Sequence, residues 1–359
     1  MQIAELRTPA MLIDTDRLAQ NCAFMAHRAH TLGVRLRPHV KTHKVPEIGR
    51  MQVADHFGGI TVSTMAEAKA FSAAGFSDIT LAVPLDPRKA SEAVALAVNV
   101  LVDSEEALAA VERVAGGCPR PRVWLKVDCG YGRAGVNPQT ESAVRLASRI
   151  HASPSVDFAG LLTHGGHSYA RIGSAAILDV AREERDAVVK FARRLRDHAI
   201  EVDEVSVGST PTMMHVDHLE GVTEIRPGNY ALFDGFQAQI GSCPRDWIAA
   251  TVLVSVISVH ADRAIVDAGA LALSKDSGLG DAGYGVVIDL SGMAVANLSL
   301  VSLSQEHGKL MGDGVSQLRV GDRLRIIPNH SCLAVACFET IYGVRKGVVE
   351  HEWTPCRGW

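Results

Sequence analysis

A lysine at position 41 stands in a run of residue types that suits covalent chemistry with a carbonyl group. Residues 34–44 begin with alternating apolar and polar positions, as a β-strand does, and place Lys41 at the far end of that strand. A desolvated lysine beside other cations has a lowered pKa and is a candidate Schiff-base amine. Its expected cationic neighbours are Arg37, His39, His43 and Lys44. The open alternative is a solvated basic turn that only binds anions.

Other polar clusters follow later predicted strands. They are Ser63-Thr64, residues 128–135, residues 164–169, residues 208–212 and residues 227–230. If the strands run parallel around a barrel, all of these clusters converge on one mouth, at the carboxyl ends of the strands. Residue types typical of catalysis therefore gather where barrel enzymes keep their active sites.

The last two clusters suit a phosphate group. They contain Ser209, Thr210, Gly228 and Asn229, and they follow the seventh and eighth predicted strands, where barrels often bind phosphate. Glycines let the backbone approach an anion, and amides, hydroxyls and a helix start donate to it. Each cluster alone is also typical of an ordinary turn and helix N-cap.

Four further side chains are expected at this mouth. Arg133, set among glycines, is placed to face an anionic oxygen of a ligand, and a surface arginine in a loop is the alternative. His164, His167 and Tyr169 are expected to line the mouth, although a histidine in such a cluster is also commonly structural.

A different pair of residues suggests a metal near the end of the chain. His330 and Cys332 are two positions apart, so in an extended segment they point the same way. Imidazole and thiolate together suit zinc, and two protein ligands leave coordination positions open for a substrate. A lone His-x-Cys is a common coincidence. Residues 305–308, Gln-Glu-His-Gly, form another polar group that either supports this site or is a turn.

Strands and helices alternate over the first two thirds of the chain, which predicts a closed parallel barrel. The predicted strands are residues 34–40, 59–63, 78–83, 99–102, 122–127, 158–163, 204–207 and 223–226, and the predicted helices include residues 16–32, 65–74, 104–114, 140–150 and 175–198. Leu18, Cys22, Met25 and Ala29 form the expected buried face of the first helix.

After about residue 240 the helical spacing stops and short strands follow. They are predicted at residues 252–259, 264–266, 286–290, 294–302, 323–327 and 334–342. The sequence therefore predicts a (β/α)8 TIM-type barrel over residues 14–243, and an all-β domain from residues 1–13 together with 244–359.

Composition excludes several other classes of protein. The chain has 359 residues, 47% of them apolar, and a net charge of −4, which gives no pull toward nucleic acid. No stretch is long and apolar enough to span a membrane, and residues 1–12 lack the apolar run of a signal peptide, so a cytoplasmic enzyme is expected. The seven cysteines are expected to be reduced, mostly as buried thiols.

Six motifs, in order, resemble those of one enzyme family. They are residues 38–44, 164–169, 206–212, 223–230, 305–308 and 328–332, and the resemblance extends to the final Arg357-Gly358-Trp359. The chain resembles the zinc-dependent D-serine dehydratases, the related D-threo-3-hydroxyaspartate dehydratases and, more loosely, the metal-activated D-threonine aldolases.

The resemblance implies a fold-type III pyridoxal 5'-phosphate enzyme, similar to alanine racemase, that acts on a small D-amino acid as a head-to-tail homodimer with its active site near the subunit interface. Lys41 would form the Schiff base with the cofactor. Arg133 would lie near the phenolic oxygen of the cofactor, and His330 and Cys332 would bind Zn2+ or another divalent metal such as Mn2+. The remaining cofactor-binding residues would be His164, Tyr169, Ser209, Thr210, Gly228 and Asn229.

The reaction implied is dehydration of a β-hydroxy D-amino acid, D-serine giving pyruvate and ammonia. Cys332 resembles the dehydratases, because the aldolase branch has a carboxylate at this ligand position. Retro-aldol cleavage of D-threonine or 3-hydroxy-D-aspartate stays open, as does dehydration of D-threo-3-hydroxyaspartate. A racemase would need a second base in the β domain, and Tyr284 and Tyr342 stand in no racemase-like motif. A non-catalytic carrier of the cofactor would be a lone barrel. The preferred substrate is not decided, and Lys41 and the His330–Cys332 pair must face one cavity for the mechanism to hold.

Overall fold

The chain forms two compact units in a computed structural model that describes residues 1–116 and 119–359. The sheet unit consists of Met1–Ala23 and Asn229–Pro355, and the barrel unit consists of Phe24–Gly228 and Cys356–Trp359. The domain limits expected from the sequence, 14–243 against 1–13 with 244–359, stay a prediction. Each unit is described by itself below.

Eight parallel strands of the described residues make the sheet of the barrel unit, in the spatial order β2-β9-β8-β7-β6-β5-β4-β3. They are β2 (Arg35–Leu36), β3 (Ile60–Val62), β4 (Ile79–Pro84), β5 (Asn99–Val102), β6 (Arg122–Lys126), β7 (Asp157–Leu162), β8 (Glu204–Val207) and β9 (Glu224–Ile225). A parallel bridge between His39 and Thr61, with the Thr61 N–H donating to the Pro38 carbonyl at 2.9 Å, joins the two ends of the sheet. The predicted barrel and its eight strands are confirmed.

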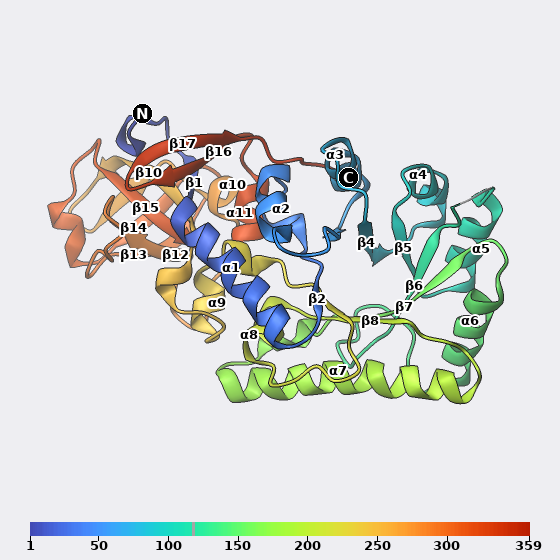
Figure 1. The fold of residues 1–359 in the computed structure, drawn as a ribbon. Coiled ribbons are helices and arrows are strands. Elements are labelled where there is room, and N and C mark those ends of the chain that lie inside the picture. The colour runs from blue at the N-terminus through green and yellow to red at the C-terminus, as the bar shows by residue number, and fades with distance from the viewer. Residues whose placement is uncertain (117–118) are drawn as a thin grey trace. The chain divides into compact units, whose positions relative to one another are not determined.

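Helices alternate with the strands of the barrel, and the first helix, α1, precedes β2 (Figure 1). They are α1 (Thr15–Thr31), α2 (Pro46–Val53), α3 (Met65–Ala73), α4 (Ala90–Ala95), α5 (Glu105–Val114), α6 (Glu141–Ala152), α7 (Ser174–Asp197) and α8 (Thr210–His215). Hydroxyl side chains cap several of them, as when Thr64 accepts from the Glu67 N–H at 3.1 Å at the start of α3. The predicted apolar face of α1 is buried, and the long helix α7 packs against β7 and β8.

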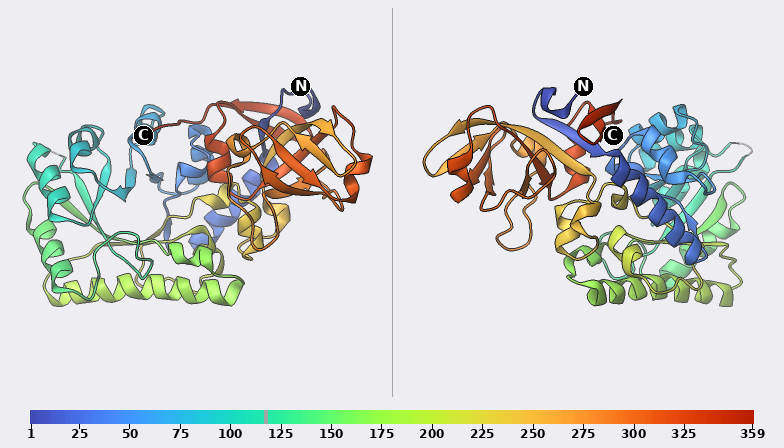
Figure 2. Two further views of the ribbon diagram at one scale, coloured as in Figure 1. Left: turned by 180° about the vertical axis from the view of Figure 1, so that it is seen from behind. Right: turned by 60° about the vertical axis from the view of Figure 1, so that its left-hand side comes forward.

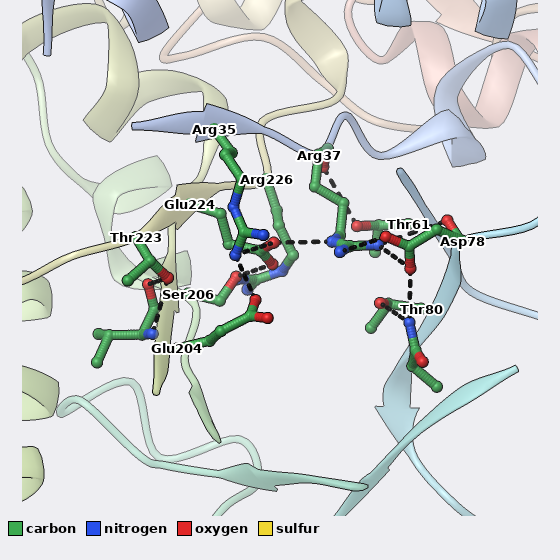
Figure 3. A network of polar contacts seen from close by, with 12 residues as sticks. Arg35, Arg37, Thr61, Asp78, Thr80, Glu204, Ser206, Thr223, Glu224 and Arg226 are labelled. Atoms are coloured by element: carbon green, nitrogen blue, oxygen red, sulfur yellow. Dashed lines mark hydrogen bonds and ion pairs between the residues drawn. The ribbon is translucent and has the colours of Figure 1, made fainter. Parts of the chain in front are cut away.

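Charged side chains occupy the inside of this barrel, where branched apolar residues usually stack (Figure 3). Arg37 is fully buried and donates to Glu224 Oε2 at 2.9 Å and to both carboxylate oxygens of Asp78 at 2.7 and 2.9 Å. Glu224 also accepts from Ser206 Oγ at 2.6 Å, and Arg226 donates to Ser206 and to the Thr163 carbonyl. Burial opposes the charge of Arg37, but Glu224 and Asp78 outweigh it and raise the pKa of the guanidinium.

The sheet unit is built around a path of strands in the order β13-β14-β11-β10-β1-β16-β17, with β15 paired to β10 and β12 paired to β15. The strands are β1 (Ala10–Asp14), β10 (Ala250–Val259), β11 (Arg263–Val266), β12 (Gly285–Ile288), β13 (Ser299–Leu303), β14 (Gly308–Met311), β15 (Arg323–Pro328), β16 (Ile341–Arg345) and β17 (Val348–Trp353). The N-terminal strand β1 is antiparallel to β10 and parallel to β16 (Figure 2). Met11, Leu12 and Ile13 are fully buried in this sheet.

The predicted strand over residues 334–342 is wrong in its first half. Residues Ser331–Ala336 form the short helix α11, and β16 begins only at Ile341. Ala334 and Val335 are buried while Leu333 is 45% exposed, so the run buries one side of a helical turn. A short apolar run fits either structure, which is why its spacing misled the prediction. Two other short helices, α9 (Gly235–Gln239) and α10 (Ala270–Leu273), interrupt the strands of this unit, and the expected strand at 294–302 begins only at Ser299.

No helix among the described residues is long and apolar enough to cross a membrane. The six described cysteines form no disulfide bond, and Cys22, Cys129 and Cys243 are buried. Cys118 lies outside the described residues.

Candidate functional site

Lys41 lies in a single 3-10 turn, η2 (Val40–Thr42), which is the next element of the chain after β2. Its backbone N–H donates to His39 Nδ1 at 3.4 Å. The next histidine, His43, is fully buried, accepts from the Val45 N–H at 3.0 Å through Nδ1 and bonds Gln52 Oε1 at 2.8 Å through Nε2. These bonds suit a neutral ring with its hydrogen on Nε2. They fix the residue that directly follows the 3-10 turn of Lys41.

The expected cationic neighbours of Lys41 are wrong in part. Burial lowers the pKa of His43 to about 4, and burial followed by the charge of Lys41 lowers the pKa of His39 well below its usual value. Both imidazoles are therefore neutral near pH 7. Arg37 is tied to Asp78 and Glu224, and Lys44 forms an ion pair with Glu67.

A different set of cations gathers at the barrel mouth. Burial lowers the pKa of His164 well below its usual value, and the charges of Lys41, Lys126 and Arg133 lower it further. Lys126, the last residue of β6, is buried, and burial together with Arg226 lowers its pKa to about 8. The charges of Lys41, Lys126 and Arg133 thus all act on the neutral imidazole of His164, and Lys126 is a lysine that the sequence did not single out.

The loop after β6 carries Arg133 and is ordered by two carboxylates. Asp128 Oδ1 accepts from the N–H groups of Gly130 and Gly132, both at 3.0 Å, and Asp103 accepts from the Gly135 N–H at 3.0 Å. The guanidinium carbon of Arg133 lies 5.2 Å from the centre of the Tyr131 ring. Arg133 is therefore exposed on an ordered loop, and its role at the mouth stays a prediction.

The loops after β7 and β8 are joined to each other. His164 Nδ1 bonds the Gly208 carbonyl at 3.2 Å, and Ser168 Oγ bonds Ser209 Oγ at 3.0 Å. Tyr169 lies in the 3-10 turn η4 (Gly166–Ala170) that follows His164. Ser209 caps α8 by accepting from the Thr212 N–H at 3.3 Å, while its own N–H donates to Thr212 Oγ1 at 2.9 Å. Thr210, the first residue of that helix, is buried.

Gly228 lies where only a glycine fits. A Cβ added to it would come within 2.5 Å of the His39 carbonyl oxygen and 2.7 Å of the His39 Cβ. The His39 N–H in turn donates to the Pro227 carbonyl at 3.0 Å. The segment after β9 and the segment that presents Lys41 are therefore pressed together.

The residues of this mouth fit pyridoxal 5'-phosphate in their chemistry. Lys41 supplies the amine, and Arg133 and Lys126 supply positive charge around a neutral histidine. Ser209, Thr210 and the start of α8 supply hydroxyl and amide donors, as a phosphate requires.

Asn229 and the His330-Ser331-Cys332 motif belong to the sheet unit and are linked by one carboxylate. Asp234 is buried, and its Oδ2 accepts from Asn229 Nδ2 at 2.8 Å and from the Ser331 N–H at 3.0 Å. Asn229 Nδ2 also donates to Ser331 Oγ at 3.0 Å and lies 3.8 Å from Cys332 Sγ. Burial raises the pKa of Asp234, although His330 and its hydrogen bonds oppose the rise.

The expectation that His330 and Cys332 share one side of an extended segment is wrong. His330 is the extended N-cap residue of α11, and Cys332 lies inside the first turn of that helix. The two side chains still interact. Burial would lower the pKa of His330, but Cys332, Asp234 and Asp276 outweigh burial and raise it to about 10.

Asp276 bonds the imidazole of His330, a candidate metal ligand. Its Oδ2 lies 2.6 Å from His330 Nδ1. A carboxylate on one ring nitrogen of a histidine fixes the tautomer and orients the other nitrogen, here Nε2, toward a metal. Imidazole nitrogen and thiolate sulfur suit zinc, so the residues fit this ion. Among the described residues no group of three or more histidine, cysteine and acidic side chains could hold a metal ion.

Residues 305–308 lie at a turn between two strands of the sheet unit. They connect β13 to β14, and Gln305, Glu306 and His307 are exposed.

Sequence reasoning missed several charged residues of these sites: Lys126, Glu184, Arg226 and Asp234 are buried, and Asp276 is exposed. Arg226 and Asp276 carry no local signal, because their partners are remote in the chain. Glu184 does carry a signal, since it interrupts the apolar stripe of helix α7.

Known proteins match both parts of the chain. Residues 13–234 match the model of the alanine racemase N-terminal domain, and residues 249–344 match that of a putative serine dehydratase domain. A D-threo-3-hydroxyaspartate dehydratase from Delftia sp. is 38% identical over 99% of this chain and 98% of that protein. This chain belongs to the family of D-serine and D-threo-3-hydroxyaspartate dehydratases.

Other members of the dehydratase family, and a related aldolase, match along the whole length. The D-serine dehydratase of Dictyostelium discoideum is 35% identical over 99% of this chain and 98% of its own length. A D-threonine aldolase from Arthrobacter is 30% identical over 98% of this chain and 92% of its own length. The solved structure of the Delftia dehydratase superposes with a TM-score of 0.95 over all of both chains, and a variant of that enzyme has been solved in a metal-free form. The alanine racemase-like fold is thereby confirmed.

Proposed function

We propose that this family member is a pyridoxal phosphate- and zinc-dependent dehydratase that converts D-serine to pyruvate and ammonia. The observation that carries the proposal is the group of Lys41, Lys126 and Arg133 around the neutral imidazole of His164, at the carboxyl ends of the barrel strands. An amine among cations at this position suits a cofactor that carries an aldehyde and a phosphate.

Lys41 is the proposed attachment point of the cofactor and the proposed base. Its Nζ takes the proton from Cα of the substrate, and the bound cofactor supplies an electron sink for the charge left behind. Arg133 holds the phenolic oxygen of the cofactor, and Ser209, Thr210 and Gly228 hold its phosphate. His164, Tyr169 and Asn229 line the rest of the cofactor-binding site.

His330 and Cys332 are the proposed metal ligands, with Mn2+ as an alternative to zinc. A metal held there supplies Lewis acidity toward the β-hydroxyl of the substrate and makes hydroxide a better leaving group. The net reaction removes water from D-serine and then adds water to release ammonia, so the products are pyruvate and ammonia in equal amounts. We further propose a cytoplasmic homodimer with active sites near its subunit interface.

Two alternatives rest on specific observations. The 38% identity to the Delftia enzyme supports D-threo-3-hydroxyaspartate as a second substrate, with oxaloacetate and ammonia as products. The 30% identity to a D-threonine aldolase supports cleavage to glycine and an aldehyde. Cys332 favours dehydration, because the resemblance associates a carboxylate at this position with aldolases.

A panel of D- and L-β-hydroxyamino acids, with every product identified, tests the proposal. We expect pyruvate and ammonia from D-serine, 2-oxobutanoate with ammonia from D-threonine, and no turnover of the L-isomers. Glycine with acetaldehyde from D-threonine would establish the aldolase instead. Chelation is expected to stop turnover while the cofactor stays bound, and full activity in a verified metal-free sample would refute the metal's role.

A further inference from the structure

A glutamate in the middle of helix α7 lies on the buried, apolar face of that helix. Glu184 is fully buried, and it continues the stripe of α7 that packs against the barrel. The other members of that stripe are Ile177, Val180, Ala181 and Val188. Burying a carboxylate is costly unless it is well hydrogen-bonded, so the partners of Glu184 indicate what it does.

Those partners are the ends of two neighbouring barrel strands. Glu184 Oε1 accepts from the N–H of Gly165, just after β7, at 2.6 Å, and from the N–H of Gly208, just after β8, at 2.9 Å. Glu184 Oε2 accepts from Thr212 Oγ1 at 3.1 Å. One side chain on a 24-residue helix therefore ties both strand ends and the first turn of α8 together.

The contact with Thr212 orients the capping residues of α8. Because the Thr212 hydroxyl donates its hydrogen to Glu184, its lone pairs are available to the Ser209 N–H, which donates to it at 2.9 Å. Ser209 Oγ accepts in turn from the Thr212 N–H at 3.3 Å. The N–H groups of Gly165 and Gly208 already donate to the Glu184 carboxylate. A phosphate at this mouth therefore depends on Ser209 and Thr210, whose positions Glu184 fixes.

We propose that Glu184 is a positioning residue for the phosphate of the cofactor. It acts through the Gly208 amide and Thr212 to fix Ser209 and Thr210, and it does not touch the cofactor itself. The inference rests on the proposed function, because it needs pyridoxal phosphate as the ligand of the barrel mouth.

The test compares pyridoxal 5'-phosphate with pyridoxal, which lacks the phosphate, as ligands of the metal-loaded protein. Equilibrium affinities for both are measured by absorbance for the wild type, Glu184→Ala and Glu184→Gln. Asp186→Ala is the matched control, because Asp186 lies on the same helix and bonds Arg185 and Lys190 of that helix.

We expect Glu184→Ala to weaken pyridoxal phosphate by about 10- to 100-fold and pyridoxal by much less, because two charge-assisted hydrogen bonds to the phosphate loop are lost. Glu184→Gln keeps an acceptor oxygen for the two glycine amides, so it should restore most of the lost affinity. Asp186→Ala should match the wild type for both ligands. If Glu184→Ala does not fold, Thr212→Val cuts the link from Glu184 to Ser209 and should show the same selective loss.

Two results would overturn the inference, and they are distinguishable. Equal weakening of pyridoxal phosphate and pyridoxal, or no weakening of either, would show that Glu184 does not act on the phosphate seat although the protein binds the cofactor. A wild-type protein that does not bind pyridoxal phosphate at all would refute the proposed function and this inference with it.

Discussion

Asp276 offers the sharpest test of the metal pair, because its role depends on one contact. Its Oδ2 lies 2.6 Å from His330 Nδ1, and this contact sets which ring nitrogen is available to a metal. Asp276→Ala removes the acceptor, so His330 is free to adopt either tautomer and to rotate. Asp276→Asn keeps an oxygen that can accept from Nδ1–H but loses the charge.

The size of the effect follows from the surroundings of this contact. Removing such a carboxylate typically lowers metal affinity by about 10- to 100-fold. The side chains of His330 and Asp276 are 40% and 48% exposed, so solvent screens part of their interaction. We therefore expect about a tenfold loss of zinc affinity for Asp276→Ala, or about 1.4 kcal/mol, and a smaller loss for Asp276→Asn.

The assay is competition for Zn2+ between the metal-free protein and a chromophoric chelator at constant pH. Asp262→Ala is the control, because Asp262 is an exposed carboxylate of the same unit that pairs with Arg263. Zinc affinity of Asp276→Ala equal to that of the wild type would show that Asp276 does not orient His330, and the reasoning about the metal pair would be refuted.

Three further predictions concern the barrel. Arg37→Met leaves Glu224 buried without its guanidinium, so urea unfolding should show a loss of about 3–5 kcal/mol, and a loss below about 1 kcal/mol would contradict a structural role for the pair. Because burial lowers the pKa of His43 to about 4 from about 6.5 in an unfolded chain, the unfolded state binds more protons in this window, and stability should fall by about 2 kcal/mol from pH 7 to pH 5. The His43→Asn variant should lack this fall in stability between pH 7 and pH 5. The same dependence of stability on pH in the variant as in the wild type would contradict the prediction. Gly228→Ala places a methyl group against His39 and should cost about 1–3 kcal/mol while weakening cofactor binding, whereas wild-type values of both would show that the close approach is not needed.

The barrel was predictable because its strands are short apolar runs between amphipathic helices. Even β9, with only Glu224 and Ile225 in regular pairing, lies within the predicted strand at residues 223–226. The part of the site that follows the strands could be predicted, because the carboxyl ends of parallel strands meet at one edge of the barrel. Lys41, Arg133 and His164 all come after such strands, whatever lies between them in the chain.

What could not be predicted are contacts between remote residues. Arg37 and Glu224 are 187 positions apart, and Asp276 and His330 are 54 apart, so no local pattern reveals either pair. The helix at Cys332 was missed because six apolar and small residues carry too little periodicity to separate a helix from a strand. Glu184 was open to detection, because a carboxylate on the buried stripe of an amphipathic helix requires a buried partner.

The most direct test of the central claim is to locate the cofactor on the chain. The protein is incubated with pyridoxal 5'-phosphate, reduced with borohydride, digested and analysed by mass spectrometry. We predict the phosphopyridoxyl group on Lys41, with none in the Lys41→Ala variant. A label on Lys126 or Lys44 in the wild type, or no label at all, would contradict the account.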